Sequence, residues 1–119
     1  SVGIVMCDLN GLKRMNDSQG HLAGDQYICD AAKILCDCFG SENVYRIGGD
    51  EFAVVLTGIS KSNLRHCCEQ LRDTTTSGSV SLSFGVEFAE HHEVPFETLL
   101  KYADEKMYED KRRYYKMLK

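Results

Sequence analysis

Residues 44–57 read VYRIGGDEFAVVLT, and this stretch indicates what kind of sheet the chain can form. Two β-rich runs, 44–47 and 52–57, flank the sequence Gly48-Gly49-Asp50. A Gly-Gly pair between two such runs is typical of the tight turn of a β-hairpin. The stretch therefore predicts two antiparallel strands whose turn carries an acidic pair, Asp50-Glu51.

Outward from this hairpin, the chain predicts two more strands and three helices. Residues 2–7 are apolar and β-rich, as in a strand buried on both faces, and residues 80–88 alternate apolar with small or polar side chains, as in a half-buried strand. Apolar positions recur at helical spacing in 24–39, 64–71 and 96–107. The order β-α-β-β-α-β-α predicts an α+β fold in which helices pack on a sheet.

Length and charge narrow the class of protein. A chain of 119 residues predicts a single domain, and a net charge of -4 argues against a nucleic-acid-binding module, which is usually basic. A nucleotide ligand would need a metal ion or a local basic patch. Because no apolar run approaches the ~20 residues of a membrane span, we expect a cytoplasmic domain without direct membrane contact, whose parent protein can still be membrane-attached.

Six cysteines could suggest a disulfide framework. They lie, however, in helix-like and strand-like runs with aliphatic neighbours, as small buried hydrophobic residues do. The pairs Cys36/Cys38 and Cys67-Cys68 also lack the two-residue gap of a zinc knuckle. We expect reduced thiols in the core.

Acidic residues stand where predicted strands end. Asp8 follows the first strand, and Asp50-Glu51 lie in the hairpin. Such carboxylates can meet at one edge of a sheet, and carboxylate oxygens completed by phosphates and water are what Mg²⁺ prefers. Spacing alone equally allows Asp8 to open the Asn10-Gly11 turn and Asp50 to serve ordinary hairpin chemistry.

The segment between the first strand and the first predicted helix is rich in polar residues. Its Asn and Asp side chains can make turns and a helix cap, or they can bind a base, since a carboxylate accepts from N1–H and the exocyclic amine of guanine. His21 fits a structural hydrogen-bonding role better than that of a catalytic base. The residues are Lys13, Asn16, Asp17, Gly20, His21, Gly24 and Asp25.

Taken in order, these motifs resemble those of a GGDEF domain over essentially the whole chain. They are Asp8-Leu9-Asn10-Gly11-Leu12-Lys13, Asn16-Asp17, Gly20-His21, Gly24-Asp25, Arg46-Ile47-Gly48-Gly49-Asp50-Glu51-Phe52, Ser83-Phe84-Gly85-Val86 and Ala103-Asp104-Glu105-Lys106-Met107-Tyr108. The resemblance implies a nucleotidyl-cyclase or palm-like (ferredoxin-like) fold with a central, mostly antiparallel sheet. It also implies a diguanylate cyclase, which condenses two GTP into cyclic di-GMP and two pyrophosphates. Each domain would hold one GTP, so a homodimer would be needed.

The same resemblance assigns roles to individual residues. Two Mg²⁺ or Mn²⁺ ions per site would be held by Asp8, Asp50, Glu51 and the backbone carbonyl of Leu9. GTP would be bound by Asn16 and Asp25 at guanine, by the amides of Gly11 and Leu12 and by Lys111 at the phosphates, with His21, Gly48 and Gly49 nearby. The catalytic group would comprise Asp50, Glu51, Lys13 and Arg46, the last two stabilising the transition state or ordering the loop.

Several positions depart from the family pattern. Asn10 stands where Asp is frequent, and Tyr115 replaces a phosphate-contacting Arg, for which Arg112, Arg113 or Lys116 are candidate substitutes. Without the Gly of that region, we expect the last helix to continue toward Lys119. Residues 39–42 lack the Arg-x-x-Asp of a product-inhibition site. The family's leading helix is also missing, so we expect a fragment of a longer protein that is inactive or weak alone.

Two other functions remain open at this point. The altered segment 111–116 is consistent with a GTP-binding regulatory module that does not turn over. If each acidic residue serves only a turn, the chain is a dimerisation or protein-interaction domain without nucleotide.

Overall fold

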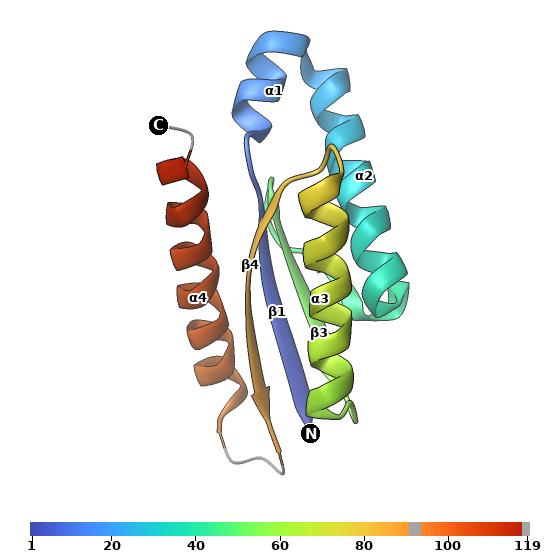
Figure 1. Ribbon diagram of the computed structural model, residues 1–119, viewed down its shortest axis with the longest axis vertical. Coiled ribbons are helices and arrows are strands. Elements are labelled where there is room, and N and C mark those ends of the chain that lie inside the picture. Colours follow the sequence, from blue (N-terminus) through green and yellow to red (C-terminus); the bar gives the residue numbers. More distant parts are fainter. Residues whose placement is uncertain (91–93, 118–119) are drawn as a thin grey trace.

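The computed structural model describes residues 1–90 and 94–117, which form one four-stranded sheet with helices on both faces (Figure 1). The elements are β1 (Val2–Leu9), α1 (Leu12–Gln19), α2 (His21–Phe39), a 3-10 turn η1 (Ser41–Asn43), β2 (Val44–Arg46), β3 (Glu51–Thr57), α3 (Lys61–Ser77), β4 (Leu82–Ala89) and α4 (Phe96–Met117). The strand order is β2-β3-β1-β4, and every neighbouring pair is antiparallel. The predicted α+β class and hairpin are confirmed.

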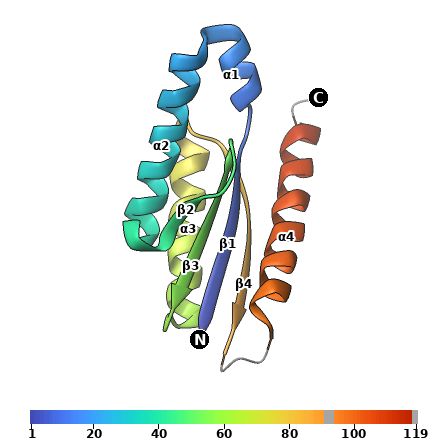
Figure 2. The same cartoon turned by 180° about the vertical axis from the view of Figure 1, so that it is seen from behind.

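Two core clusters lie on the two faces of the sheet. Helices α2 and α3 cover one face and α4 covers the other, as both views show (Figures 1 and 2). Along β1, Val5 and Cys7 point into the larger cluster under α2 and α3, whereas Ile4 and Met6 point into the smaller one under α4. This period of two follows from the pleat of a strand. The prediction that β1 is buried on both faces is confirmed.

The interpretation of β4 as half-buried is wrong. Its small and polar residues do not face solvent, since Ser83 is 1% exposed and Gly85 is buried beneath α4. A Cβ on Gly85 would collide with the backbone carbonyl of Ala103 and the backbone N–H of Met107. The alternation of large and small residues therefore reflects the close approach of a helix. It is not a sign of exposure.

The segment after β1 differs from the expected connection. It contains the additional helix α1, and α2 begins at His21, three residues before the predicted start at Gly24. Gly11 at φ 75° and Gly20 at φ 92° bound α1, in the left-handed region that suits glycine. Helix α1 has only eight residues, of which Leu12 and Met15 pack, partly buried, against the core, and so short an apolar pattern does not indicate a helix in the sequence.

The cysteines are free in the described structure, but not all belong to the core. Cys7 is buried, Cys29 is exposed, and the others are half-buried, so the expectation of core thiols is wrong for Cys29. Burial raises the pKa of Cys68 to about 12. A thiol with so high a pKa is protonated at neutral pH and is a poor nucleophile.

Within residues 1–90 and 94–117, no helix has both the length and the apolar character that crossing a membrane requires.

Candidate functional site

Three carboxylates meet where β1 ends beside the β2–β3 turn. Asp8 pairs with Glu51 across the β1–β3 ladder, and Asp50 precedes Glu51 in the turn. One carboxylate oxygen of each lies within 4.8 Å of the others. The N–H of Leu9 donates to the Asp50 carbonyl at 2.8 Å, which holds the turn against β1. The structure therefore brings the predicted acidic residues together.

Asp8 is the buried member of this cluster, with its side chain 9% exposed. Lys111 of α4 donates from Nζ to Asp8 Oδ2 at 2.8 Å. Burial raises the pKa of Asp8 to about 6, against the lowering effect of Lys111 and with a further rise from Asp50. Although burial alone would lower the pKa of Lys111, the hydrogen bond and the charge of Asp8 raise it.

The other oxygen of Asp8 suggests what this cluster accommodates. Oδ1 is buried and has no hydrogen-bond partner among residues 1–90 and 94–117. An unpartnered carboxylate oxygen is costly to bury, and a divalent cation bound by several carboxylates would satisfy it. The donor set of Asp8, Asp50 and Glu51 therefore fits a hard cation such as Mg²⁺.

Arg46 lies at the same turn but points at its backbone. Nε donates to the Gly48 carbonyl at 3.1 Å, and a terminal nitrogen donates to the Gly49 carbonyl at 2.8 Å. In this structure Arg46 holds the Gly-Gly turn in place. Around Gly49 the space is open, since an added Cβ would meet nothing within 4 Å. The turn is thus fixed from one side and accessible from the other.

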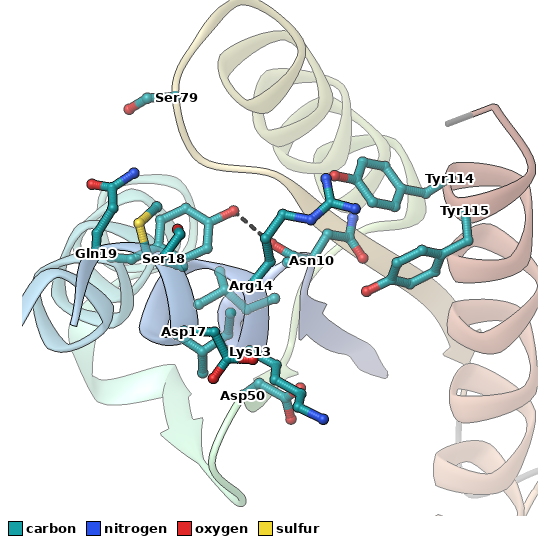
Figure 3. Close-up of a pocket in the computed structure, with 15 residues that line it drawn as sticks. Asn10, Lys13, Arg14, Asp17, Ser18, Gln19, Asp50, Ser79, Tyr114 and Tyr115 are labelled. Atoms are coloured by element: carbon teal, nitrogen blue, oxygen red, sulfur yellow. Dashed lines mark hydrogen bonds between the residues drawn. The ribbon is translucent and has the colours of Figure 1, made fainter. Parts of the chain in front are cut away.

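A cleft of about 760 Å³ adjoins the acidic cluster (Figure 3). It is lined by the β1–α1 turn, α1 and the last turns of α4. These segments lie around the end of the sheet where β1 finishes (Figure 1). The predicted phosphate-binding residues Gly11 and Leu12 line it, together with Lys13, Asp50 and Tyr115. The acidic cluster thus has a cavity of nucleotide size beside it.

The β1–α1 turn is held by a buried hydrogen-bond network around Asn10, which is 3% exposed. Asn10 Nδ2 donates to Ser81 Oγ at 3.0 Å, and Ser83 Oγ donates to Asn10 Oδ1 at 3.0 Å. Tyr27 donates from its hydroxyl to the Asn10 carbonyl at 2.8 Å. An asparagine can donate and accept here, whereas an ionised aspartate could only accept. Nothing in the sequence pattern marks Tyr27, Ser81 and Ser83 as supports of this turn, apart from the place of the two serines in the alternating run.

The two predicted guanine contacts lie on facing helices. Asn16 of α1 packs against Gly24 of α2, where an added Cβ would overlap Asn16 Oδ1. Asp25 follows Gly24 and is exposed, as is His21 at the start of α2. Neither Asn16 nor Asp25 lines the 760 Å³ cleft. The structure places both beside the α1–α2 contact, with no hydrogen bond between them among the described residues.

Comparison with known proteins gives an independent line of evidence. The family described as "Diguanylate cyclase, GGDEF domain" matches residues 1–116. The probable diguanylate cyclase DgcI of Escherichia coli is 35% identical over 112 residues, which is 92% of this chain and 25% of DgcI. The cyclic di-GMP phosphodiesterase PdeR of the same species is 33% identical over 116 residues, which is 90% of this chain and 18% of PdeR.

Solved structures agree with the sequence matches. The active GGEEF domain of a diguanylate cyclase from Vibrio cholerae has a TM-score of 0.77 at 26% identity, over 94% of this chain and 77% of that chain. The GGDEF domain of YfiN from Pseudomonas aeruginosa has a TM-score of 0.81 at 29% identity, over 94% and 72% respectively. The chain therefore spans most of these solved domains, but only a quarter or less of the two curated relatives.

Proposed function

Because the chain belongs to the diguanylate cyclase GGDEF-domain family, we propose that it binds one GTP and makes cyclic di-GMP when two copies face each other. The observation that supports this most directly is the buried Asp8, whose Oδ1 lacks a partner among the described residues, beside Asp50 and Glu51 at the mouth of a nucleotide-sized cleft. A buried aspartate with a purely structural role normally has both carboxylate oxygens hydrogen-bonded within the protein.

In this proposal Asp8, Asp50, Glu51 and the carbonyl of Leu9 hold two divalent cations, Mg²⁺ or Mn²⁺. Bound there, the cations would stabilise charge on the α-phosphate and make the ribose 3′-hydroxyl easier to ionise. The 3′-oxygen of one GTP forms a bond to the α-phosphorus of the other, the bond to pyrophosphate breaks, and the hydroxyl proton passes to solvent. Two such displacements close the ring and release two pyrophosphates.

The remaining assigned residues bind and orient the nucleotide. Gly11 and Leu12 line the cleft at the start of α1, where backbone N–H groups and the helix dipole favour an anion. Lys111 would exchange part of its contact with Asp8 for a phosphate oxygen once a metal is bound. Asn16 and Asp25 would select guanine, since their helices meet at Gly24.

Catalysis requires a second copy, because one domain presents one GTP and the attacking hydroxyl belongs to another. The test is to fuse the chain to a strong dimeriser, supply GTP with Mg²⁺, and separate the products chromatographically. We expect cyclic di-GMP from the fusion and none from its Asp50→Ala variant. A fusion that binds Mg-GTP but yields no cyclic di-GMP at high protein concentration would exclude the cyclase and favour the second function below.

We expect no inhibition by the product cyclic di-GMP through residues 39–42. That segment contains Glu42 and no cation, and it forms the end of α2 and the start of η1. An anionic dinucleotide would meet a like charge there. We expect cyclic di-GMP added at micromolar concentration to leave the initial rate of the dimerised protein unchanged.

A GTP-binding regulatory module is the second candidate, and Tyr115 favours it. This side chain lines the cleft where it can offer a hydroxyl but no positive charge. Calorimetry separates the two functions: binding of Mg-GTP without turnover in the dimerised protein indicates the regulatory module. No binding at all would instead indicate a dimerisation or interaction domain.

A further inference from the structure

The cleft beside the acidic cluster continues away from the carboxylates toward α4. At that far end its walls are α1 on one side and Tyr114 and Tyr115 on the other (Figure 3). The two tyrosine rings pack edge to face, with centroids 5.1 Å apart and planes at 83°. A triphosphate held at one end by metals on Asp8 and Asp50 would extend along the first turn of α1 into this space.

The positively charged side chains that line the cleft belong to α1. Lys13 and Arg14 both line it, and Figure 3 shows Arg14 extending from α1 into the space between that helix and Tyr114. Within residues 1–90 and 94–117 neither Lys13 nor Arg14 has a carboxylate within ion-pair distance, whereas Lys111 is engaged with Asp8. An arginine that lines a cleft without a counter-ion is available for an anion.

The basic residues Arg112, Arg113 and Lys116 of α4 do not line the main cleft. Arg112 and Lys116 line a smaller hollow of about 440 Å³ that Tyr115 also borders, and neither lines the main cleft. Arg113 lies 3.6 Å from Asp110. The three residues that the sequence suggested as substitutes at the phosphates therefore do not reach the cleft in this structure.

We propose that Arg14 binds the terminal phosphate of Mg-GTP and, after displacement, the released pyrophosphate. This inference rests on the proposed binding of Mg-GTP at the acidic cluster. The guanidinium is planar and donates two parallel hydrogen bonds to phosphate oxygens, and it keeps its charge at every physiological pH. Tyr115 leaves the far end of the cleft without a cation from α4, and Arg14 supplies one from the opposite wall.

Affinities for GTP and GDP test this role, because only GTP carries the γ-phosphate. Calorimetry on the dimerised protein, with Ca²⁺ replacing Mg²⁺ to slow turnover, compares the wild type with Arg14→Gln and with Lys33→Gln. Gln keeps the helix propensity of Arg, so α1 is preserved. Lys33 is an exposed cation of α2 outside the cleft and serves as the neutral control.

We expect Arg14→Gln to weaken GTP binding by about 10- to 100-fold, the range of a charge-assisted hydrogen-bonded contact, and GDP binding by less than about 3-fold. Lys33→Gln should bind both nucleotides as the wild type does. Adding Tyr115→Arg to Arg14→Gln should restore most of the GTP affinity, since the new guanidinium enters the same cleft from α4.

Four results would overturn the inference. Equal losses for GTP and GDP in Arg14→Gln would mean that the residue does not contact the terminal phosphate. A GTP-selective loss in Arg112→Gln, with none in Arg14→Gln, would assign the contact to α4. A wild type that binds neither nucleotide would overturn the proposed function as well, whereas a binding wild type with unchanged Arg14→Gln would overturn this inference alone.

Discussion

Lys111 Nζ lies 2.8 Å from Asp8 Oδ2 and so connects the last helix to the end of the first strand, 103 residues earlier in the chain. The contact lies at the acidic cluster, with Lys111 23% exposed and Asp8 9% exposed at their side chains. It gives Lys111 two tasks. Without metal, Lys111 compensates the charge of Asp8; in the proposed function, it would bind phosphate once metal and nucleotide are present.

Replacing Lys111 with methionine tests the first task. The variant leaves a buried carboxylate without its cation, and we expect a loss of about 2 kcal/mol in the free energy of unfolding without metal. Urea denaturation at pH 7 with EDTA measures it. Excess Mg²⁺ should recover part of the loss, since the metal replaces the missing charge. An unchanged midpoint with EDTA would show that the ion pair does not contribute to stability.

The pH dependence of stability reports on Asp8 directly. Its pKa is raised to about 6, whereas an aspartate in an unfolded chain titrates near 3.9. The folded protein thus binds this proton more tightly than the unfolded chain does. The stabilisation that protonated Asp8 contributes to the fold is therefore fully present below about pH 4 and is lost as the pH rises through about 6. The difference of about two pH units corresponds to about 3 kcal/mol.

Asp8→Asn is the matched variant for this measurement, because an amide cannot ionise. In EDTA, we expect the wild type to lose stability relative to Asp8→Asn between pH 4 and pH 7, and Mg²⁺ to reduce that loss in the wild type only. Parallel pH profiles of the two proteins would contradict this. The variant should also fail to bind Mg-GTP, so that stability and function change in opposite directions.

Gly85 tests how closely α4 approaches the sheet. In Gly85→Ala the new methyl would meet the backbone of Ala103 and Met107, which cannot move without displacing the helix. We expect a loss of about 1–3 kcal/mol in thermal unfolding, typical of an overpacked core. Gly49→Ala is the control, since its Cβ would meet nothing within 4 Å. Equal stability of the two variants would mean that α4 tolerates a wider separation.

The sequence predicted those parts of the site that depend on local patterns. Asp8 ends an apolar run and Asp50-Glu51 sit in a Gly-Gly hairpin, which allowed a shared metal site as one of two interpretations, and the resemblance to GGDEF domains favoured it; the antiparallel pairing of β1 with β3 brings these residues together. Helix α1 was missed because its eight residues offer only Leu12 and Met15 as an apolar pair against the core, too short a pattern to show a helical period. Its polar residues were interpreted as a connection.

Contacts between segments far apart in the chain could not be predicted from local sequence patterns. Asn10 contacts Ser81 and Ser83 only because β4 pairs with β1, whereas the sequence predicts no more than an alternating, half-buried strand there. The place of Arg14 is a similar case, since the sequence alone directed attention to the basic residues of α4. Which cation reaches the cleft depends on how α1 and α4 are oriented at the end of the sheet.

Asp110 holds α4 in the position that lets the next residue, Lys111, reach Asp8. Asp110 Oδ2 accepts from the N–H of Phe84 at 3.0 Å and from Arg72 at 3.1 Å, and the Arg72 guanidinium lies 4.1 Å above the Phe84 ring. One carboxylate thus joins α4 to β4 and to α3. We expect Asp110→Ala to cost about 2 kcal/mol in urea unfolding, since a backbone N–H and a guanidinium lose a partly buried partner.

The same variant should weaken Mg-GTP binding about tenfold by letting the end of α4 move, although Asp110 is not assigned a contact with nucleotide. Arg113→Gln is the matched control, because it removes only an exposed pair of Asp110 at 3.6 Å, worth less than about 0.5 kcal/mol. The stability and the Mg-GTP affinity of Asp110→Asn should lie between those of Asp110→Ala and Arg113→Gln, since the amide oxygen of Asn can still accept from the N–H of Phe84. If Asp110→Ala loses stability but binds Mg-GTP as the wild type does, Lys111 does not depend on this anchor for its position.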